Sequence, residues 1–349
     1  MIKIKLQINK ILRVILIGLL VVSCNKNDKS YSEKDISFYE KESFRNKKDL
    51  THIKTDEISD SIFQPSYIEI VNNYLILLDR KSKKPFHLVD LITEKYLGSF
   101  IKKGQGPNEV HVPWTISKID NESFLAYDVA GKKILGLHID SLLNGRKPIF
   151  EKKINEKGFC SSIQIVNDDI YYTSDLNSTN RLFKINSLTG KEEAFGTLLK
   201  NYKNISDINF GQACRAIMSY NNDNNKFVVA YKLAPFFEIY NLKNNEQKSI
   251  LTIDNFSPIY REVESEGYTR FATTKETRLG IINISLSKNY IYLLYSGEKM
   301  HDHIMDVGNK IMVFDYGGNP VTFYQLDKNL SSFAVYNDSI IYGIHNDIK

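Results

Sequence analysis

The densest group of side chains able to bind a metal ion is His301, Asp302 and His303, with Asp306 close behind. In an extended loop, residues two apart point to the same side, so the imidazoles of His301 and His303 could share one transition-metal ion. The loop around them is polar, and an exposed cluster of this kind is usually solvated. His301 and His303 are therefore candidate metal ligands, and a plain surface loop is the interpretation that the sequence favours.

Two of the three cysteines precede short predicted strands in the same way, Cys160 before Ile163 and Cys214 before Ile217. In an exported protein such a pair could form a disulfide, because the compartment is oxidising. A disulfide needs a short Cα separation, which a sequence does not give. Two buried free thiols remain the favoured alternative.

The sequence contains none of the common catalytic signatures. Gly-x-Ser-x-Gly, a P-loop, His-Glu-x-x-His, an EF-hand loop and paired-cysteine zinc spacing are all missing. We therefore expect no catalytic residues and no cofactor, and the sequence favours a binding protein over an enzyme.

A glycine-rich loop, KGQGPNE at residues 103–109, is the most distinctive short motif. Gly104 and Gly106 are expected to adopt positive φ in a tight connection, and Pro107 to stiffen it. Glu109 could bond to free backbone N–H groups of the loop or face a ligand. The structural use is favoured, because Gly-Pro segments are typical of turns.

One short pattern occurs six times along the chain. An Asn- or Asp-rich turn is followed by a run of β-branched and aromatic residues, and these runs begin at Tyr74, Phe124, Ile170, Phe227, Tyr290 and Ile340. Successive copies are 46 residues (Phe124 to Ile170) to 63 residues (Phe227 to Tyr290) apart. That spacing suits a four-stranded propeller blade. The sequence therefore predicts an all-β, six-bladed β-propeller with four antiparallel strands per blade over residues 36–349.

Two parts of this repeat are irregular. The sixth unit has only two predicted strands before Lys349, so we expect strands within residues 50–58 to complete it and close the ring. The longest spacing contains an insertion at about 255–275. Within it, residues 260–267 are expected to form a helical turn that a glycine ends.

The start of the chain has the pattern of an export signal. Lysines and one arginine are followed by an apolar run at 14–22 that is too short to span a membrane, and then by Ser23 and Cys24. Residues 21–24 (VVSC) resemble the lipobox of a bacterial lipoprotein. This resemblance implies a signal peptide at 1–23, lipid on Cys24 and membrane anchoring through several acyl chains. Residues 24–35 are polar and are expected to be a flexible tether. An ordinary cleaved signal with a chance cysteine is the alternative.

The charge of the chain excludes a general nucleic-acid-binding role. The formal net charge is +5, from 46 basic and 41 acidic residues, but four of the basic residues lie in the predicted signal. Without them the balance is close to +1, which provides no basic surface for nucleic acid.

The loop at 103–109, the lipobox and the repeated strands together resemble the TolB-like and BF3164-like six-bladed β-propeller lipoproteins of Bacteroidota. The resemblance covers about residues 36–349. It differs at Asn108, where a glycine is usual in this loop. What the resemblance implies is a cell-envelope lipoprotein, at the outer membrane and facing the periplasm or the surface, mostly without an assigned activity.

The order of strands in a propeller places the blade-to-blade loops and the second-to-third strand loops on one face. That face is expected to hold the candidate ligand-binding residues Arg80, Gly104, Gln105, Gly106, Glu109, Trp114 and Arg215, together with the loop at 301–303. An exposed tryptophan near arginines is a common recognition set. For Trp114, a core position between blades is the competing interpretation.

Two functions from different classes are consistent with this architecture. The favoured one is a membrane-anchored, non-catalytic module that binds a protein, peptide or glycan at the propeller mouth. The alternative is a metal-dependent propeller hydrolase or lyase, resembling the gluconolactonase and paraoxonase group, acting on a small molecule or a glycan. It would need carboxylates and asparagines converging from several inner strands. Glu69 and scattered asparagines are all that the sequence offers.

Overall fold

Strands make up almost all of the regular structure. The computed structural model describes residues 2–5, 36–54, 62–155, 160–174, 182–196, 213, 215–244, 246–265, 268–300 and 306–345. Its helical elements are a 3-10 turn, η1 (Lys41–Ser43), and a short helix, α1 (Ile139–Leu143). Neither described helix has the length and hydropathy that crossing a lipid bilayer requires.

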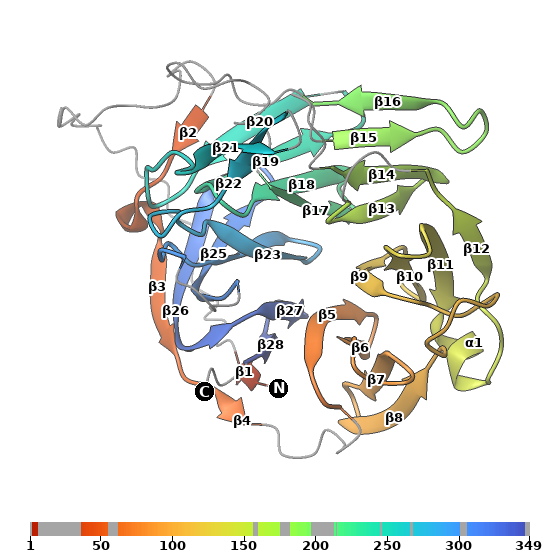
Figure 1. The fold of residues 1–349 in the computed structure, drawn as a ribbon. Coiled ribbons are helices and arrows are strands. Elements are labelled where there is room, and N and C mark those ends of the chain that lie inside the picture. The colour runs from red at the N-terminus through yellow and green to blue at the C-terminus, as the bar shows by residue number, and fades with distance from the viewer. Residues whose placement is uncertain are drawn as a thin grey trace.

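Five blades are each built from four consecutive antiparallel strands (Figure 1). Blade 1 contains β5 (Pro65–Val71), β6 (Tyr74–Asp79), β7 (Phe86–Asp90) and β8 (Lys95–Phe100). Blade 2 contains β9 (Pro113–Lys118), β10 (Ser123–Asp128), β11 (Lys133–His138) and β12 (Phe150–Lys153). Blade 3 contains β13 (Ile163–Val166), β14 (Asp169–Thr173), β15 (Leu182–Ile185) and β16 (Glu192–Phe195). Blade 4 contains β17 (Ala216–Asn221), β18 (Lys226–Tyr231), β19 (Phe236–Asn241) and β20 (Glu246–Leu251). Blade 5 contains β23 (Ile281–Leu286), β24 (Tyr290–Tyr295), β25 (Gly308–Asp315) and β26 (Pro320–Leu330).

A composite sheet occupies the remaining position between blades 5 and 1. It has the order β27 (Ser332–Tyr336), β28 (Ile340–Ile344), β1 (Ile2–Lys5) and β4 (Ile53–Lys54). The expected closing strand within residues 50–58 is therefore present as β4, at the outer edge. The third position is taken by β1, which was not predicted. Because β1 lies in the predicted signal peptide, cleavage before Cys24 would remove this strand from the sheet.

The first strands of the blades surround the centre, and the later strands lie progressively further out (Figure 1). Adjacent first strands contact one another around the whole ring, from β5 through β9, β13, β17, β23 and β27 back to β5. Serine hydroxyls bond to the backbone of the next first strand at four of these junctions: Ser117 to Ile163, Ser162 to Met218, Ser285 to Val335 and Ser332 to Ile68. These bonds satisfy polar groups that would otherwise be buried without partners.

The segment 36–54 runs along the outside of blades 4 and 5. Strand β2 (Ile36–Phe38) pairs in parallel with β20, and β3 (Asn46–Leu50) pairs in parallel with β26. Between them Phe44 is buried, and its ring lies 5.3 Å from that of Phe314 and 5.8 Å from that of Phe323, between ring centroids. The β-branched and aromatic residues at 36–39 (ISFY) predict a short strand there, but not its use as a fifth strand of a blade. These added strands cover edges that would otherwise expose unpaired backbone groups.

The insertion in the 255–275 region forms a β-hairpin, so the predicted helical turn at 260–267 is wrong. Strands β21 (Arg261–Ser265) and β22 (Tyr268–Ala272) pair antiparallel. In β21 the charged residues Arg261, Glu262 and Glu264 flank a β-branched Val263, and such a period-two pattern suits an extended strand better than a helix.

The repeated Asn- and Asp-rich turns join the first and second strands of the blades. Asn72, Asn167, Asp168, Asn337 and Asp338 adopt positive φ values between 49° and 69°. Asparagine and aspartate enter this left-handed region more readily than other residues with a side chain, so they recur in tight hairpins. The feature that identified the repeat in the sequence is thus a backbone requirement of each blade.

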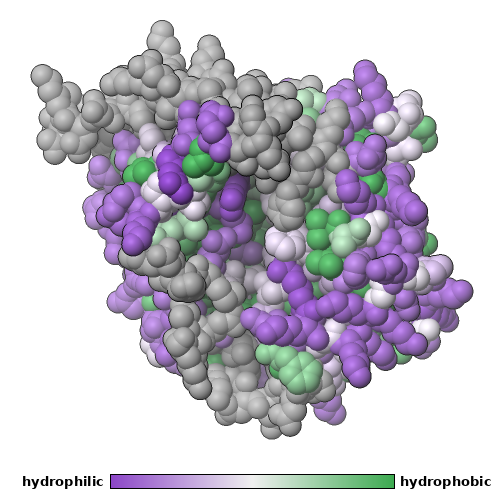
Figure 2. Space-filling view, in the orientation of Figure 1, coloured by the Kyte–Doolittle hydropathy of each residue, from purple (hydrophilic) through white to green (hydrophobic). Residues whose placement is uncertain are grey.

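The apolar residues form clusters within blades and at their contacts, and the described surface is largely hydrophilic. Figure 2 shows hydrophilic residues over most of the described part of the face in view, with hydrophobic residues in small separate groups. The large hydrophobic side chains that remain exposed include Ile53, Phe63, Ile92 and Leu188, which come from different elements. Scattered exposed apolar residues are normal for a folded domain.

Candidate functional site

The two faces of the propeller differ in the loops that build them. We call the face formed by the first-to-second strand turns the turn face. The opposite face, formed by the blade-to-blade connections and the second-to-third strand loops, is the linker face. All seven residues that the sequence proposed as ligand contacts belong to the linker face.

A pocket of about 680 Å³ opens on the turn face. This volume lies within the usual range for small-ligand sites. Its walls come from blades 1, 2, 4 and 5 and from the composite sheet, each contributing the end of its first strand and the turn that follows. Each of these turns contributes at least one asparagine: Asn72 and Asn73, Asn121, Asn222, Asn289 and Asn337.

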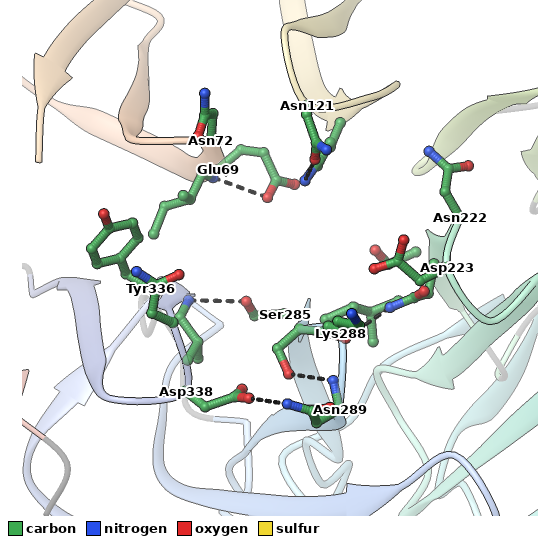
Figure 3. A pocket seen from close by; sticks show the side chains of 18 of the residues that line it. Glu69, Asn72, Asn121, Asn222, Asp223, Ser285, Lys288, Asn289, Tyr336 and Asp338 are labelled. Atoms are coloured by element: carbon green, nitrogen blue, oxygen red, sulfur yellow. Dashed lines mark hydrogen bonds between the residues drawn. The ribbon is translucent and has the colours of Figure 1, made fainter.

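Hydrogen bonds between blades fix the rim of this pocket. The hydroxyl of Tyr336 donates to Asn73 Oδ1 at 2.7 Å, which joins the composite sheet to blade 1. Asn289 Nδ2 donates to Asp338 Oδ2 at 3.0 Å, which joins blade 5 to the composite sheet (Figure 3). Because these bonds connect different blades, the rim is held in place before any ligand arrives.

Among the described residues of blade 3, none lies in the pocket wall. Asn222 on blade 4 instead donates from Nδ2 to the carbonyl oxygen of Ile119 on blade 2, at 2.6 Å. This bond connects the two blades that flank blade 3 in the ring. The pocket is therefore asymmetric, with its wall formed by five of the six sheets.

Glu69 is the acidic side chain that extends from a first strand into the pocket wall. Figure 3 shows it extending from blade 1 toward Asn121 on blade 2. Burial raises the pKa of the Glu69 carboxyl to about 7, against the opposing effects of the Ile70 N–H and the charge of Lys118. The Ile70 N–H donates to Glu69 Oε1 at 3.0 Å, and Lys118 Nζ donates to Asn121 Oδ1 at 3.0 Å. Desolvation thus outweighs both stabilising contacts, and the carboxyl titrates near neutral pH.

Polar groups continue below the pocket along the first strands. Asn283 on β23 is buried, and its Oδ1 has no hydrogen-bond partner among the described residues. Burial and the charge of Glu69 raise the pKa of Tyr67 above its ordinary value. The centre of the ring is therefore polar beneath the pocket as well as within it.

On the linker face, Arg80 and Trp114 are brought together as a structural pair. The Arg80 guanidinium donates from Nε to the Pro113 carbonyl at 3.1 Å and from Nη2 to the Trp114 carbonyl at 2.6 Å. Its carbon Cζ lies 4.3 Å from the centre of the Trp114 ring, which is a cation–π contact. Trp114 is half-buried and packs against the core of blades 2 and 3. The pair joins blade 1 to blade 2.

The loop at 103–109 is closed by its own glutamate. Glu109 Oε2 accepts a hydrogen bond from the Gly106 N–H at 2.9 Å. A Cβ atom on Gly104 would lie only 2.1 Å from Glu109 Oε2, so Gly104 leaves space for the carboxylate. The prediction that Gly104 and Gly106 adopt positive φ is wrong. Asn108 adopts it instead, with φ of 59°, which suits the position where the resembling loops have glycine. Gln105 is exposed in the same loop.

The aspartates that end the second strands of blades 1 and 2 are also structural. Asp79 is fully buried and accepts bonds from the N–H groups of Phe63, Gln64 and Lys81 and from the Ser82 hydroxyl. Asp128 accepts from the N–H groups of His111, Val112 and Gly131 in the same way. Each carboxylate therefore fixes the chain that enters its blade.

A buried Ser82–His87 contact resembles part of a catalytic triad but lacks access to substrate. His87 Nε2 lies 3.1 Å from Ser82 Oγ, while the Ser82 hydroxyl donates directly to Asp79. Ser82 is only 5% exposed and His87 only 1%. A nucleophilic serine would have to face solvent and bond to the base, so this contact is part of the core of blade 1.

The remaining candidates are only partly within the described structure. Arg215 is exposed at the start of β17, with its guanidinium carbon 5.8 Å from the centre of the Phe271 ring. His301, His303, Cys24 and Cys214 lie outside the described residues. Asp306, which was placed beside the histidines, pairs with Lys232 at 3.0 Å.

Among the described residues, no group of three or more His, Cys, Asp or Glu side chains could hold a metal ion. Cys160 is buried, and its Sγ lies 3.3 Å from the carbonyl oxygen of Ser162. Because Cys214 lies outside the described residues, the choice between a disulfide and two free thiols stays a prediction.

The pocket-lining turns were visible in the sequence but were interpreted only as markers of the repeat. The order of strands within a blade would have shown that all these turns lie on the same face of the propeller. The cavity that the described residues leave open on the turn face could not be inferred, because it depends on how loops of different length pack.

Residues 43–338 match the family model described as "TolB-like 6-blade propeller-like". The chain belongs to this TolB-like family. This match covers most of the chain and confirms the resemblance to the TolB-like propellers. The structure confirms an all-β propeller with four strands per blade, in which five blades are built from consecutive strands and the predicted sixth position holds the composite sheet. No curated protein sequence matches this TolB-like propeller.

Several solved structures have a similar fold. A member of the DUF4221 family from Bacteroides vulgatus ATCC 8482 superimposes with a TM-score of 0.54 at 10% identity, covering 81% of this chain and 88% of that chain. A putative exported protein from Bacteroides fragilis NCTC 9343 has a TM-score of 0.48 at 13% identity, covering 86% and 85% of the two chains. An auxiliary nutrient binding protein from Bacteroides thetaiotaomicron VPI-5482 has a TM-score of 0.47 at 9% identity, covering 82% and 70%. At these identities the similarity concerns the fold.

Proposed function

We propose that this TolB-like propeller is a non-catalytic binding protein of the cell envelope that holds a polar ligand in the turn-face pocket. The observation that carries the proposal is the pocket of about 680 Å³, whose walls present amide, hydroxyl and charged groups from five sheets. Binding at the mouth of a closed β structure is common. Because propellers support both binding and catalysis, the argument rests on the site and not on the fold.

The rim favours binding by a preformed site. The bonds from Tyr336 to Asn73 and from Asn289 to Asp338 hold neighbouring turns at fixed positions. A preformed site loses less entropy when a ligand binds than one that must become ordered. Glycans and polar peptides are the ligand classes that such a wall can serve.

The proposal is tested by screening the purified protein against immobilised oligosaccharides and peptides. We expect at least one class to bind, and the ligand to raise the melting temperature. Replacing Ser219, which lines the pocket, with tryptophan should abolish that binding while the protein stays folded by circular dichroism. Binding that persists in a folded Ser219→Trp variant would contradict the assignment of the pocket.

The second part of the proposal is the membrane anchor. The apolar run, the lipobox-like residues 21–24 and the polar segment 24–35 support a lipid on Cys24 and a flexible connection to the propeller. The location we propose is the outer membrane, with the propeller facing the periplasm or the surface. Replacing Cys24 with alanine should move the protein from the membrane to the soluble fraction. Retention of Cys24→Ala in washed membranes would refute the lipid anchor.

The metal-dependent hydrolase alternative needs carboxylates and asparagines from several inner strands, and the turn-face pocket is lined by both. Among the described residues, however, no three His, Cys, Asp or Glu side chains form a group that could hold a metal ion. Elemental analysis of the purified protein decides this point. One tightly held divalent ion per chain would favour the hydrolase over the binding protein.

A further inference from the structure

Two adjacent first strands contribute an acidic and a basic side chain to the wall of the turn-face pocket. Glu69 comes from β5 and Lys118 is the last residue of β9, and both line the cavity. The charge of Lys118 acts directly on the Glu69 carboxyl. Two adjacent first strands therefore place a hydrogen-bond acceptor and a hydrogen-bond donor side by side at the mouth.

Both groups have bonding capacity beyond their contacts within the protein. The contact found for the Glu69 carboxylate is one bond from the Ile70 N–H, whereas a carboxylate can accept about four. Lys118 donates one of its three ammonium hydrogens to Asn121. The unused capacity faces a cavity that a small molecule can enter.

The other charges of the wall favour a ligand without net charge. Asp120, Asp223 and Asp338 line the pocket with Lys288. An anion bound at Lys118 would also meet Glu69 and the acidic excess of the wall, and a cation bound at Glu69 would meet the charge of Lys118. Burying an unpaired charge is expensive, so mixed signs around one cavity select against both kinds of ion.

Two tyrosines supply fixed apolar surface in the same wall. The hydroxyl of Tyr220 donates to Asn225 at 3.0 Å and that of Tyr336 donates to Asn73 at 2.7 Å. Because these hydroxyls are engaged, the aromatic carbon atoms are the parts left to contact a ligand. A ligand with hydroxyl groups along one edge and C–H groups on its faces matches this combination.

We propose that the turn-face pocket binds a neutral carbohydrate, with two adjacent hydroxyls of one sugar ring contacting Glu69 as acceptor and Lys118 as donor. One hydroxyl of such a pair donates to the carboxylate while its neighbour accepts from the ammonium. This inference rests on the proposed binding function and narrows it to one class of ligand.

The pair makes carbohydrate binding depend on pH. The groups that face Glu69 are Lys118 from β9 and Tyr67 from its own strand, with the rim charges Asp120 and Lys288 in the same cavity. The Glu69 carboxyl has a pKa of about 7, so it is ionised at pH 8 and protonated at pH 5. A charge-assisted hydrogen bond is roughly twice as strong as a neutral one, so we expect affinity to fall about fivefold from pH 8 to pH 5.

The test begins with an array of neutral oligosaccharides, uronic-acid oligosaccharides and peptides, followed by calorimetric titration of the best binder. We expect a neutral oligosaccharide to bind, Glu69→Gln to weaken it about fivefold at pH 8, as protonation of Glu69 does, and Lys118→Met to weaken it about tenfold. Glu69→Gln should also remove the pH dependence. Glu298→Gln is the matched control, because Glu298 is an exposed carboxylate of the linker face, and it should leave affinity unchanged. Deoxy analogues that lack one hydroxyl of the adjacent pair should lose affinity to a similar degree.

The outcomes separate this inference from the proposed function. If only peptides or uronic-acid oligosaccharides bind, and Ser219→Trp abolishes that binding, the carbohydrate inference is wrong and the binding pocket stands. The inference also fails if a neutral oligosaccharide binds equally well to Glu69→Gln and to the wild-type protein at pH 8. If no class binds in a way that Ser219→Trp abolishes, both proposals fail.

Discussion

The linker face and the turn face use polar side chains in opposite ways. On the linker face, the Arg80 guanidinium bonds to two carbonyls and covers Trp114, and the carboxylates of Glu109 and Asp79 bond to nearby backbone N–H groups. On the turn face, bonds between neighbouring turns fix a rim, and a cavity remains inside it. A conspicuous motif therefore marks an irregular connection in this protein, while the repeated and less distinctive turns build the pocket.

The physical reason lies in what each connection must accomplish. A blade-to-blade linker crosses from the outside of one sheet to the centre of the next, and its N–H groups lack ladder partners, so buried acceptors such as Asp79 and Asp128 are required. A two-residue hairpin needs only residues that tolerate positive φ, such as Asn337. The side chains of such a hairpin are then available to line the rim of the turn-face pocket.

The largest expected effect is on the linker face, from Asp79→Ala. This change removes the acceptor for three backbone N–H groups and the Ser82 hydroxyl, and should lower the free energy of unfolding by about 4 kcal/mol. Urea unfolding measures the loss. Asp79→Asn retains one acceptor oxygen and should lose less. A change below about 1 kcal/mol for Asp79→Ala would contradict the structural role of this carboxylate.

On the turn face, Glu69→Gln should stabilise the protein at high pH. The folded-state pKa of about 7 exceeds the ordinary value of 4.5, so stability falls as pH rises from about 4.5 to 7. Glutamine removes this loss. The free energy of unfolding of Glu69→Gln should therefore exceed that of the wild type by about 3 kcal/mol at pH 8, and the two should be equal at pH 4. Thermal and urea unfolding at both pH values provide the comparison. Equal stability at pH 8 would show that Glu69 is well solvated.

Arg80→Ala should affect stability without affecting binding. The loss of two hydrogen bonds to carbonyls and of the Trp114 contact is worth about 2 kcal/mol. Ligand affinity should be unchanged, because Arg80 does not line the turn-face pocket. A weaker ligand affinity in a folded Arg80→Ala protein would indicate that the ligand contacts the linker face.

The smallest expected effect is from Gly104→Ala. The added methyl group would meet Glu109 Oε2, so the carboxylate would move and its bond to Gly106 would be lost, at about 1 kcal/mol. In a Glu109→Ala background the same change should cost much less, since no carboxylate remains to be displaced. Additive losses in the double variant would mean that Gly104 is required for another reason.

The blades could be predicted from the sequence, but the pocket on the turn face could not. The apolar runs after Asn72 and Asn337 correctly predict second strands, because period and β-branched content determine local structure. The parallel pairing of β2 and β3 with blades 4 and 5 was missed, since pairing at an outer edge depends on contacts such as Phe44 with Phe323 that are distant along the chain. The pocket was missed for the same reason. Its wall at Glu69 and Lys118 forms only when the ring brings β5 and β9 together.

The most direct test of the two-face comparison places tryptophan at each end of one inner strand. Ser219 lies on β17 in the pocket wall, and Arg215 lies just before β17 on the linker face. With both variants folded, calorimetry with the ligand found by the array should show binding lost in Ser219→Trp and retained in Arg215→Trp. Binding retained in Ser219→Trp and lost in Arg215→Trp would contradict the account.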